Sequence, residues 1–184
     1  MPLTALDPKA ALIVIDLQKG VVGLATAHPT ADMVRRSADL ARAFRARGHV
    51  VVWVNVSGRA PGRTEAGPPR AAFPAGWDEL VPELGVQPGD LRITKQHIGA
   101  FLGTSLDAAL RQRGVTQVVM TGVATGSGVE GTARSAHDLG YNVAFVTDAM
   151  TDMDAEVHRL CVEKLFPRYG ELITTDGLLA LLKS

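Results

Sequence analysis

Three separated parts of the sequence carry residue types that could act together on a substrate. Asp16 directly follows the apolar run at residues 11–15, and Lys95 directly follows a shorter run at 91–94. Residues 121–134 read TGVATGSGVEGTAR, a glycine-rich turn that leads into a helical pattern. A carboxylate at the end of a buried strand is partly desolvated, which raises its pKa unless a cation lies near. Asp16 and Lys95 are therefore candidates for an acid and its charged partner.

Each of these features also has a purely structural interpretation. Asp16 could cap the segment that follows it, and a single lysine such as Lys95 is usually solvated. The glycine-rich turn could direct backbone N–H groups at an anion or a developing oxyanion, or it could simply be a tight turn. Its glycines match neither the P-loop pattern nor the dinucleotide-binding fingerprint.

The elements that must position these residues alternate between strands and helices. Strands are predicted at 11–15, Val50–Val56, 91–94, Gln117–Val123, 142–147 and 171–174, and helices at 31–47, 105–113, 129–139 and 154–165. Strands buried on both faces and separated by helices indicate an α/β fold, a mostly parallel six-stranded sheet with helices on both faces. Ligands bind such sheets outside the carboxyl ends of the strands. We expect one domain over residues 1–184, and the long loop at 57–76 is a candidate lid.

The bulk composition excludes several classes of partner. Lys plus Arg and Asp plus Glu both number 19, so the net charge is zero, which argues against nucleic acid or a membrane surface as partner. No apolar run approaches the roughly 18 residues that span a bilayer, and the amino terminus shows no signal pattern, so a cytoplasmic location is expected. The single cysteine, Cys161, excludes an intramolecular disulfide and a thiolate zinc cluster.

Several short segments, taken in order, resemble the isochorismatase-like superfamily from about residue 11 to residue 174. They are Asp16-Leu17-Gln18, Lys95 with Ala100-Phe101 and Thr104, residues 122–125, Val129-Glu130 with Thr132-Ala133-Arg134, Leu139-Gly140-Tyr141, and Asp148-Ala149. The resemblance implies a three-layer α/β/α hydrolase that assembles as a homo-oligomer, a dimer or a tetramer. Most members carry a cysteine nucleophile at the helix start, and an ungapped count places Gly128 there.

Neither Cys161 nor Ser127 is expected to replace the missing cysteine as the nucleophile. Cys161 lies in a helical pattern at a spacing typical of core packing. Ser127 is adjacent to Gly128, but the sequence places no histidine to activate it. Metal-binding amidases of the superfamily carry an acidic and histidine cluster after the second strand, where this chain has Asn55-Val56-Ser57-Gly58. The histidines, His28, His49, His97, His137 and His158, are scattered, so we predict no metal and no cofactor and disfavour nicotinamidase activity.

The chemistry that needs no nucleophile is hydrolysis of a vinyl ether. True isochorismatases also place glycine at this position, and cleavage begins when a general acid protonates the enol carbon. The resemblance thus assigns Asp16 as the acid, Lys95 as its partner and Gly128 as a backbone donor with room for substrate. Lys95 should lower the pKa of Asp16, which opposes that role. Expected substrate contacts are Gln18, Asn55, Arg59, Arg63, His97, Phe101, Ala124, Thr125 and Ser127, with the two arginines facing substrate carboxylates.

Three alternatives stay open at this point. The chain could be a small-molecule binding relative without catalysis, in which case a ring such as Phe101 or Trp77 would fill the pocket. It could be an amidase with an unrecognised nucleophile. Gly128 could also replace a cysteine by drift or engineering, and restoring that cysteine would then give amidase activity.

Overall fold

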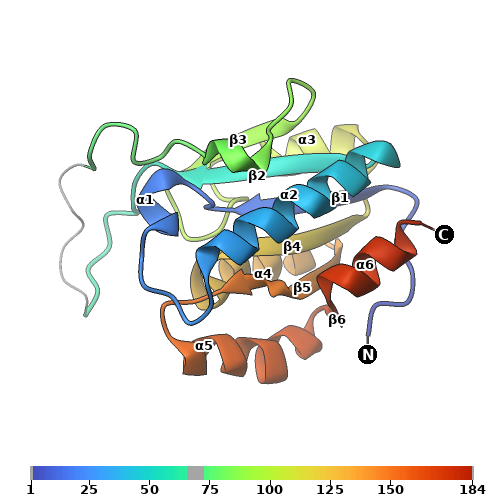
Figure 1. The fold of residues 1–184 in the computed structure, drawn as a ribbon. Helices are drawn as coiled ribbons and strands as arrows, with labels where there is room; N and C mark the ends of the chain where they lie inside the picture. Colours follow the sequence, from blue (N-terminus) through green and yellow to red (C-terminus); the bar gives the residue numbers. More distant parts are fainter. Residues whose placement is uncertain (1, 66–72, 184) are drawn as a thin grey trace.

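A single sheet of six parallel strands forms the centre of the molecule in the computed structural model, which describes residues 2–65 and 73–183 (Figure 1). The strand order is β3-β2-β1-β4-β5-β6, and every neighbouring pair is parallel. The strands are β1 (Ala10–Ile15), β2 (Val50–Val56), β3 (Leu91–Lys95), β4 (Gln117–Val123), β5 (Asn142–Thr151) and β6 (Glu171–Ile173). The predicted α/β fold with a six-stranded parallel sheet is confirmed.

Helices cover both faces of the sheet, with α2 and α6 on one face and α3 and α4 on the other (Figure 1). The helices are α1 (Lys19–Val22), α2 (Thr30–Ala46), α3 (Leu106–Gln112), α4 (Glu130–Asp138), α5 (Ala155–Leu160) and α6 (Thr175–Leu181). Shorter turns are η1 (Pro82–Leu84), η2 (Thr125–Val129), η3 (Cys161–Leu165) and η4 (Phe166–Arg168). No helix among the described residues is long and apolar enough to cross a membrane.

Alternation along β1 explains why both faces are covered. Leu12 and Val14 pack into the core beneath α2 and α6, whereas Ala11, Ile13 and Ile15 pack into the core beneath α3 and α4. All six residues of β1 are buried. A strand that is apolar on both faces must lie inside a three-layer structure.

One predicted boundary is wrong. The strand predicted to end at residue 147 continues to Thr151, because its pairing with β4 resumes after a register shift between Met120 and Gly122. The helix predicted at 154–165 is present as α5, which continues into the π-helical turn η3. The helix predicted at 129–139 is present as α4 and follows another π-helical turn, η2. The helices α1 and α6 were not predicted from the sequence.

A buried carboxylate attaches α2 to the loop before β3. Asp90, whose side chain is 4% exposed, accepts hydrogen bonds from Arg45 Nε at 2.9 Å and from Trp53 Nε1 at 2.7 Å. The backbone N–H of Gln87 is a further donor, at 2.8 Å. Burial alone raises the pKa of Asp90, but these hydrogen bonds outweigh burial and hold the pKa below its ordinary value.

Asp90→Asn should lower the free energy of unfolding by about 2 kcal/mol at pH 7, because charge-assisted hydrogen bonds are lost and Arg45 loses its partner. Since the folded pKa is depressed, the stabilisation is present above the unfolded pKa and is lost as the pH falls through the folded pKa. Urea unfolding at pH 7 and at pH 3 measures both effects. Asp32→Asn, which removes an exposed ion pair with Arg35, is the matched control and should cost less than about 0.5 kcal/mol.

Candidate active site

Asp16 and Lys95 form a buried ion pair at the carboxyl end of the sheet. Asp16 follows β1 and Lys95 is the last residue of β3, and the two strands flank β2. Lys95 Nζ lies 2.8 Å from Asp16 Oδ2, and the two side chains are only 3% and 8% exposed. Lys95 Nζ also donates a hydrogen bond of 3.3 Å to the carbonyl of His97. The structure thus brings together the two residues that the sequence analysis paired.

The backbone at Asp16 is locked in an uncommon conformation. Its φ is +52°, and among the described residues it is the one non-glycine position with a positive φ. The N–H of Asp16 donates to the carbonyl of Val54, and its own carbonyl accepts from the N–H of Gln18, both at 2.9 Å. Non-glycine residues in this region are uncommon and gather at functional sites. The turn directs the carboxyl group toward the β3 side of the edge, where Lys95 meets it.

The two oxygens of the Asp16 carboxyl group have different surroundings. Oδ2 contacts Lys95, whereas Oδ1 is buried and has no hydrogen-bond partner among the described residues. Burial disfavours the ionised form more than Lys95 stabilises it, so the pKa of Asp16 rises to about 6. The lowering by Lys95 that the sequence analysis anticipated is present, but burial is the larger effect.

Gly128 completes a group of three at this edge. It is buried within η2, the turn that follows β4 and a cis peptide bond between Val123 and Ala124. A Cβ at Gly128 would lie 3.2 Å from Asp16 Oδ2 and 2.9 Å from Ile15 Cγ2. The residue therefore stands directly beside the ion pair, and its lack of a side chain leaves the carboxyl group uncrowded on that side.

Four side chains hold the Gly128 turn in place, and of these only Thr125 was among the predicted site residues. Asp152 Oδ2 accepts from the N–H of Gly126 at 2.8 Å, and Thr125 Oγ1 lies 2.8 Å from His158 Nδ1. Thr132 Oγ1 donates to the carbonyl of Gly128 at 2.6 Å and accepts from the N–H of Ala100 at 3.0 Å. No such role was predicted for Asp152, Thr132 or His158 from the sequence. The position of Asp152, just after β5 at the same edge of the sheet, was the signal available for it.

Two of the predicted substrate contacts have their polar atoms bound within the protein. Gln18 is fully buried, its Nε2 donates to the carbonyls of Val56 and Trp77, and its Oε1 accepts from the N–H of Val56. Asn55 donates to the carbonyl of Asp78 and accepts from Thr94 Oγ1. These contacts attach the segment around Trp77 to the strand ends.

The other predicted contacts differ in accessibility. Arg59, Arg63 and Ser127 are exposed, His97 is half-buried, and Ala124, Thr125 and Phe101 are buried. Phe101 lies beside Tyr141, with ring centroids 5.9 Å apart, and Trp77 packs over Gly20 and stacks on Phe73. Both aromatic rings thus pack against other parts of the chain. The predicted lid at 57–76 includes residues 66–72, which lie outside the described residues.

Cys161 is buried in the core, and two of the histidines lie close together. Cys161 is 3% exposed in the core, and burial, followed by Glu130 and Asp152, raises the pKa of its thiol. A protonated, enclosed thiol is a poor nucleophile. The histidines are not all scattered as predicted, because the His28 and His158 rings lie 4.8 Å apart. Within residues 2–65 and 73–183, no group of three or more His, Cys, Asp or Glu side chains could hold a metal ion.

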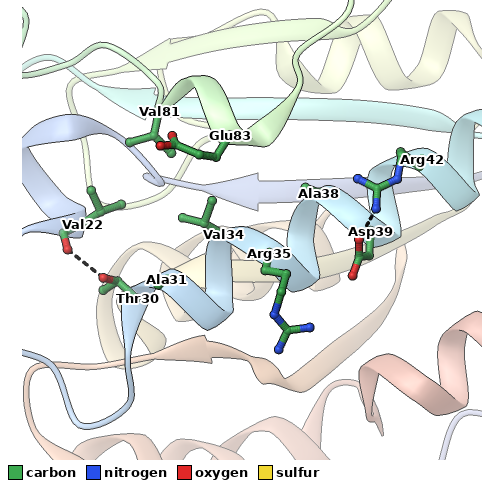
Figure 2. A pocket seen from close by; sticks show the side chains of 10 residues that line it. All are labelled: Val22, Thr30, Ala31, Val34, Arg35, Ala38, Asp39, Arg42, Val81 and Glu83. Carbon is green, nitrogen blue, oxygen red and sulfur yellow. Dashed lines mark hydrogen bonds and ion pairs between the residues drawn. The ribbon is translucent and has the colours of Figure 1, made fainter.

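A groove of about 560 Å³ runs along α2 on the outer surface (Figure 2). Its floor is apolar, with Val22, Val34 and Val81 among the lining residues, and Thr30 closes one end by donating to the carbonyl of Val22. Arg42 pairs with Asp39 at the other end. None of the predicted site residues lines this groove, so it is separate from Asp16.

Comparisons with known proteins identify the family and the fold. Residues 10–177 match the model of the isochorismatase domain. The uncharacterized isochorismatase family protein YwoC of Bacillus subtilis is 40% identical over 182 residues, 95% of each chain. The ureidoacrylate amidohydrolase RutB of Stutzerimonas stutzeri is 31% identical over 179 residues, 80% of this chain and 72% of that one. A solved structure of an isochorismatase family protein from Burkholderia thailandensis superposes with a TM-score of 0.92 at 39% identity, over 98% of both chains. The chain belongs to the isochorismatase family of hydrolases.

Proposed function

We propose that this protein hydrolyses a small anionic vinyl ether, with Asp16 as the general acid and without a covalent intermediate. The observation that carries the proposal is the unpartnered, buried Oδ1 of Asp16. An ionised carboxylate oxygen without a donor is costly in such a place, whereas a protonated one is tolerated. Lys95 occupies Oδ2, so Oδ1 is the oxygen that holds the proton.

The reaction then follows in balanced steps. Asp16 transfers its proton to the enol carbon of the substrate, which leaves an oxocarbenium ion and an Asp16 carboxylate that Lys95 stabilises. Water adds to the cation and returns a proton to the carboxylate. The resulting hemiketal breaks down to an alcohol and a keto acid. No step requires a nucleophilic side chain, in keeping with Gly128 beside the carboxyl group.

Substrate anchoring is assigned to the groups that remain accessible. Arg59 and Arg63 are exposed in the loop after β2, and guanidinium groups bind carboxylates in a bidentate manner. His97 is half-buried next to the Lys95 contact. The side chains of Gln18, Asn55 and Thr125 are engaged within the protein, so we assign them to support of the site.

A substrate screen tests this function directly. Purified protein is incubated with isochorismate and, separately, with ureidoacrylate and other small amides, and the products are identified by mass spectrometry. We expect a keto acid from the vinyl ether and no ammonia from the amides. Ammonia release without vinyl-ether cleavage would contradict the proposal.

An amidase is the second candidate, favoured by the 31% identity to a ureidoacrylate amidohydrolase. Ser127 is the accessible hydroxyl next to Gly128. If the protein is an amidase through this residue, Ser127→Ala abolishes activity. Under the vinyl-ether mechanism, Ser127→Ala keeps activity within about threefold, because no step uses its hydroxyl.

The pH dependence of turnover should report the protonated form of Asp16. Since its pKa is raised to about 6, kcat/KM should be highest below pH 6 and fall about tenfold per pH unit above it.

Lys95→Met removes the positive charge that lowers the pKa of Asp16, so the decline of kcat/KM with pH should begin at a higher pH than in the wild type. Rates measured from pH 5 to pH 8 test both statements. A rate that rises through pH 6 would indicate a base instead of an acid.

A further inference from the structure

We propose that Asp152 is a positioning residue for the reaction at Asp16, because it fixes the turn that carries Gly128. Asp152 directly follows β5 and is buried, with 6% of its surface exposed. Its Oδ2 accepts a hydrogen bond of 2.8 Å from the N–H of Gly126, the second residue of η2. The inference rests on the proposed function only in taking Asp16 as the group that reacts.

An irregularity in the sheet brings Asp152 to this turn. If the register in which β4 and β5 begin their pairing continued unbroken, Asp148 would lie opposite Val123. After the register shift, Val123 lies opposite Thr151 instead. Asp152 is the next residue along, so it meets the chain where β4 passes into η2.

Gly128 has little room to move beside Asp16. A Cβ at Gly128 would lie 3.2 Å from Asp16 Oδ2 and 2.9 Å from Ile15 Cγ2, so the backbone already stands close to both. A displacement of about 1 Å near reacting groups costs up to about 100-fold in rate. Because a glycine-rich turn has many accessible conformations, contacts from other segments must hold it in one of them.

The two ends of the turn are held by different elements. On the α4 side, Thr132 Oγ1 donates a hydrogen bond of 2.6 Å to the carbonyl of Gly128. On the β4 side, Ala124 precedes η2 and supplies no side-chain cap. Asp152 supplies that cap from the neighbouring strand, and a carboxylate is a favourable acceptor at the positive end of a helix dipole.

The surroundings of Asp152 favour order in the turn over stability. Within residues 2–65 and 73–183, Asp152 takes part in no ion pair. Its Oδ1 accepts from the N–H of Asp154 at 3.3 Å. Burying a carboxylate without a cation is costly. Because its donors are backbone groups of two different segments, what Asp152 fixes is the position of one segment relative to the other.

Kinetics on the substrate found in the screen test the proposal. Asp152→Ala removes the acceptor and releases the turn, so kcat should fall roughly 30-fold while KM changes less than about threefold. Asp152→Asn keeps an acceptor for the N–H of Gly126 and should keep kcat within about threefold of the wild type. If Asp152→Ala does not fold, Asp152→Ser takes its place, because its hydroxyl lies one bond nearer the backbone.

Thr174→Ala is the matched control for the loss of a cap. Thr174 Oγ1 accepts from the N–H of Gly177 at 3.3 Å and caps α6, on the other face of the sheet from α4. The substitution should lower the unfolding temperature and leave kcat unchanged. A purely structural role for Asp152 would give the same result in Asp152→Ala and would overturn the proposal.

Amide hydrogen exchange measures the same hydrogen bond without any substrate. Exchange at Gly126 should be at least about tenfold faster in Asp152→Ala than in the wild type, with Val119 in β4 unchanged. Unchanged exchange at Gly126, or an equal loss of kcat in Asp152→Asn, also overturns the proposal. If no vinyl ether is cleaved, the proposed function alone fails, since the exchange experiment does not depend on it.

Discussion

Asp16→Asn should reduce kcat/KM about 1,000-fold while the affinity for substrate changes less than tenfold. The amide keeps the size and a hydrogen-bonding group but has no acidic proton to transfer, and general acids contribute factors of about 10² to 10⁴. Steady-state kinetics on the substrate found in the screen, together with calorimetric titration of product, separates turnover from binding.

The control for this prediction addresses the buried charge that the substitution leaves behind. In Asp16→Asn the ammonium of Lys95 loses its partner at 2.8 Å, which by itself destabilises the protein. Asp16→Asn/Lys95→Met removes both charges, so it should be more stable than the single variant and equally inactive. If the double variant recovered turnover, charge balance and not proton transfer would be the role of Asp16.

Gly122→Ala should lower the free energy of unfolding by more than about 3 kcal/mol. Gly122 lies in β4 opposite Ile15 with φ of +112°, a conformation that residues with a Cβ rarely adopt. An added Cβ would stand 2.6 Å from the nitrogen and 2.8 Å from the carbonyl carbon of Ile15, so the two central strands would have to separate. Overpacking of that kind commonly costs 1–3 kcal/mol, and backbone strain adds to it. Chemical denaturation at pH 7 measures the loss.

Gly140→Ala is the matched control for the strand contact. Gly140 also has a positive φ, +84°, but nothing lies within 4 Å of the position that its Cβ would take. The substitution should therefore cost only the backbone strain, about 1–2 kcal/mol. Equal losses at the two positions would mean that the close approach of β1 and β4 contributes nothing.

The pairing of Asp16 with Lys95 was predictable because parallel strands end at a common edge, whatever their distance in the sequence. The sheet itself was predicted from the alternation of buried strands with helices, and the rule about strand ends then placed Gly128 near both residues. The rule about strand ends does not say whether a side chain at that edge contacts substrate or bonds within the protein. Gln18 and Asn55 were predicted to contact substrate from position alone, yet their amides bond to backbone groups around Trp77.

Other features depend on contacts that no local pattern encodes. The pKa of Asp16 is decided by the balance between burial and one cation, and the sequence indicates both without their relative size. His28 and His158 come from distant segments, so their proximity follows only from how the loop before α2 meets α5. The glycine-rich turn before the helix was predicted, but its π-helical form η2 was not, because a glycine-rich run does not specify which carbonyl each N–H will contact.

The space around Gly128 also constrains the evolutionary routes open to this protein. A cysteine there would place its Cβ 2.9 Å from Ile15 Cγ2, a rigid methyl group on a fully buried strand residue. The single substitution Gly128→Cys should therefore be selected against, because the new side chain would collide with Ile15. The order of mutations would matter. A smaller residue at position 15 would have to arise first, and Gly128→Cys could then follow without the collision.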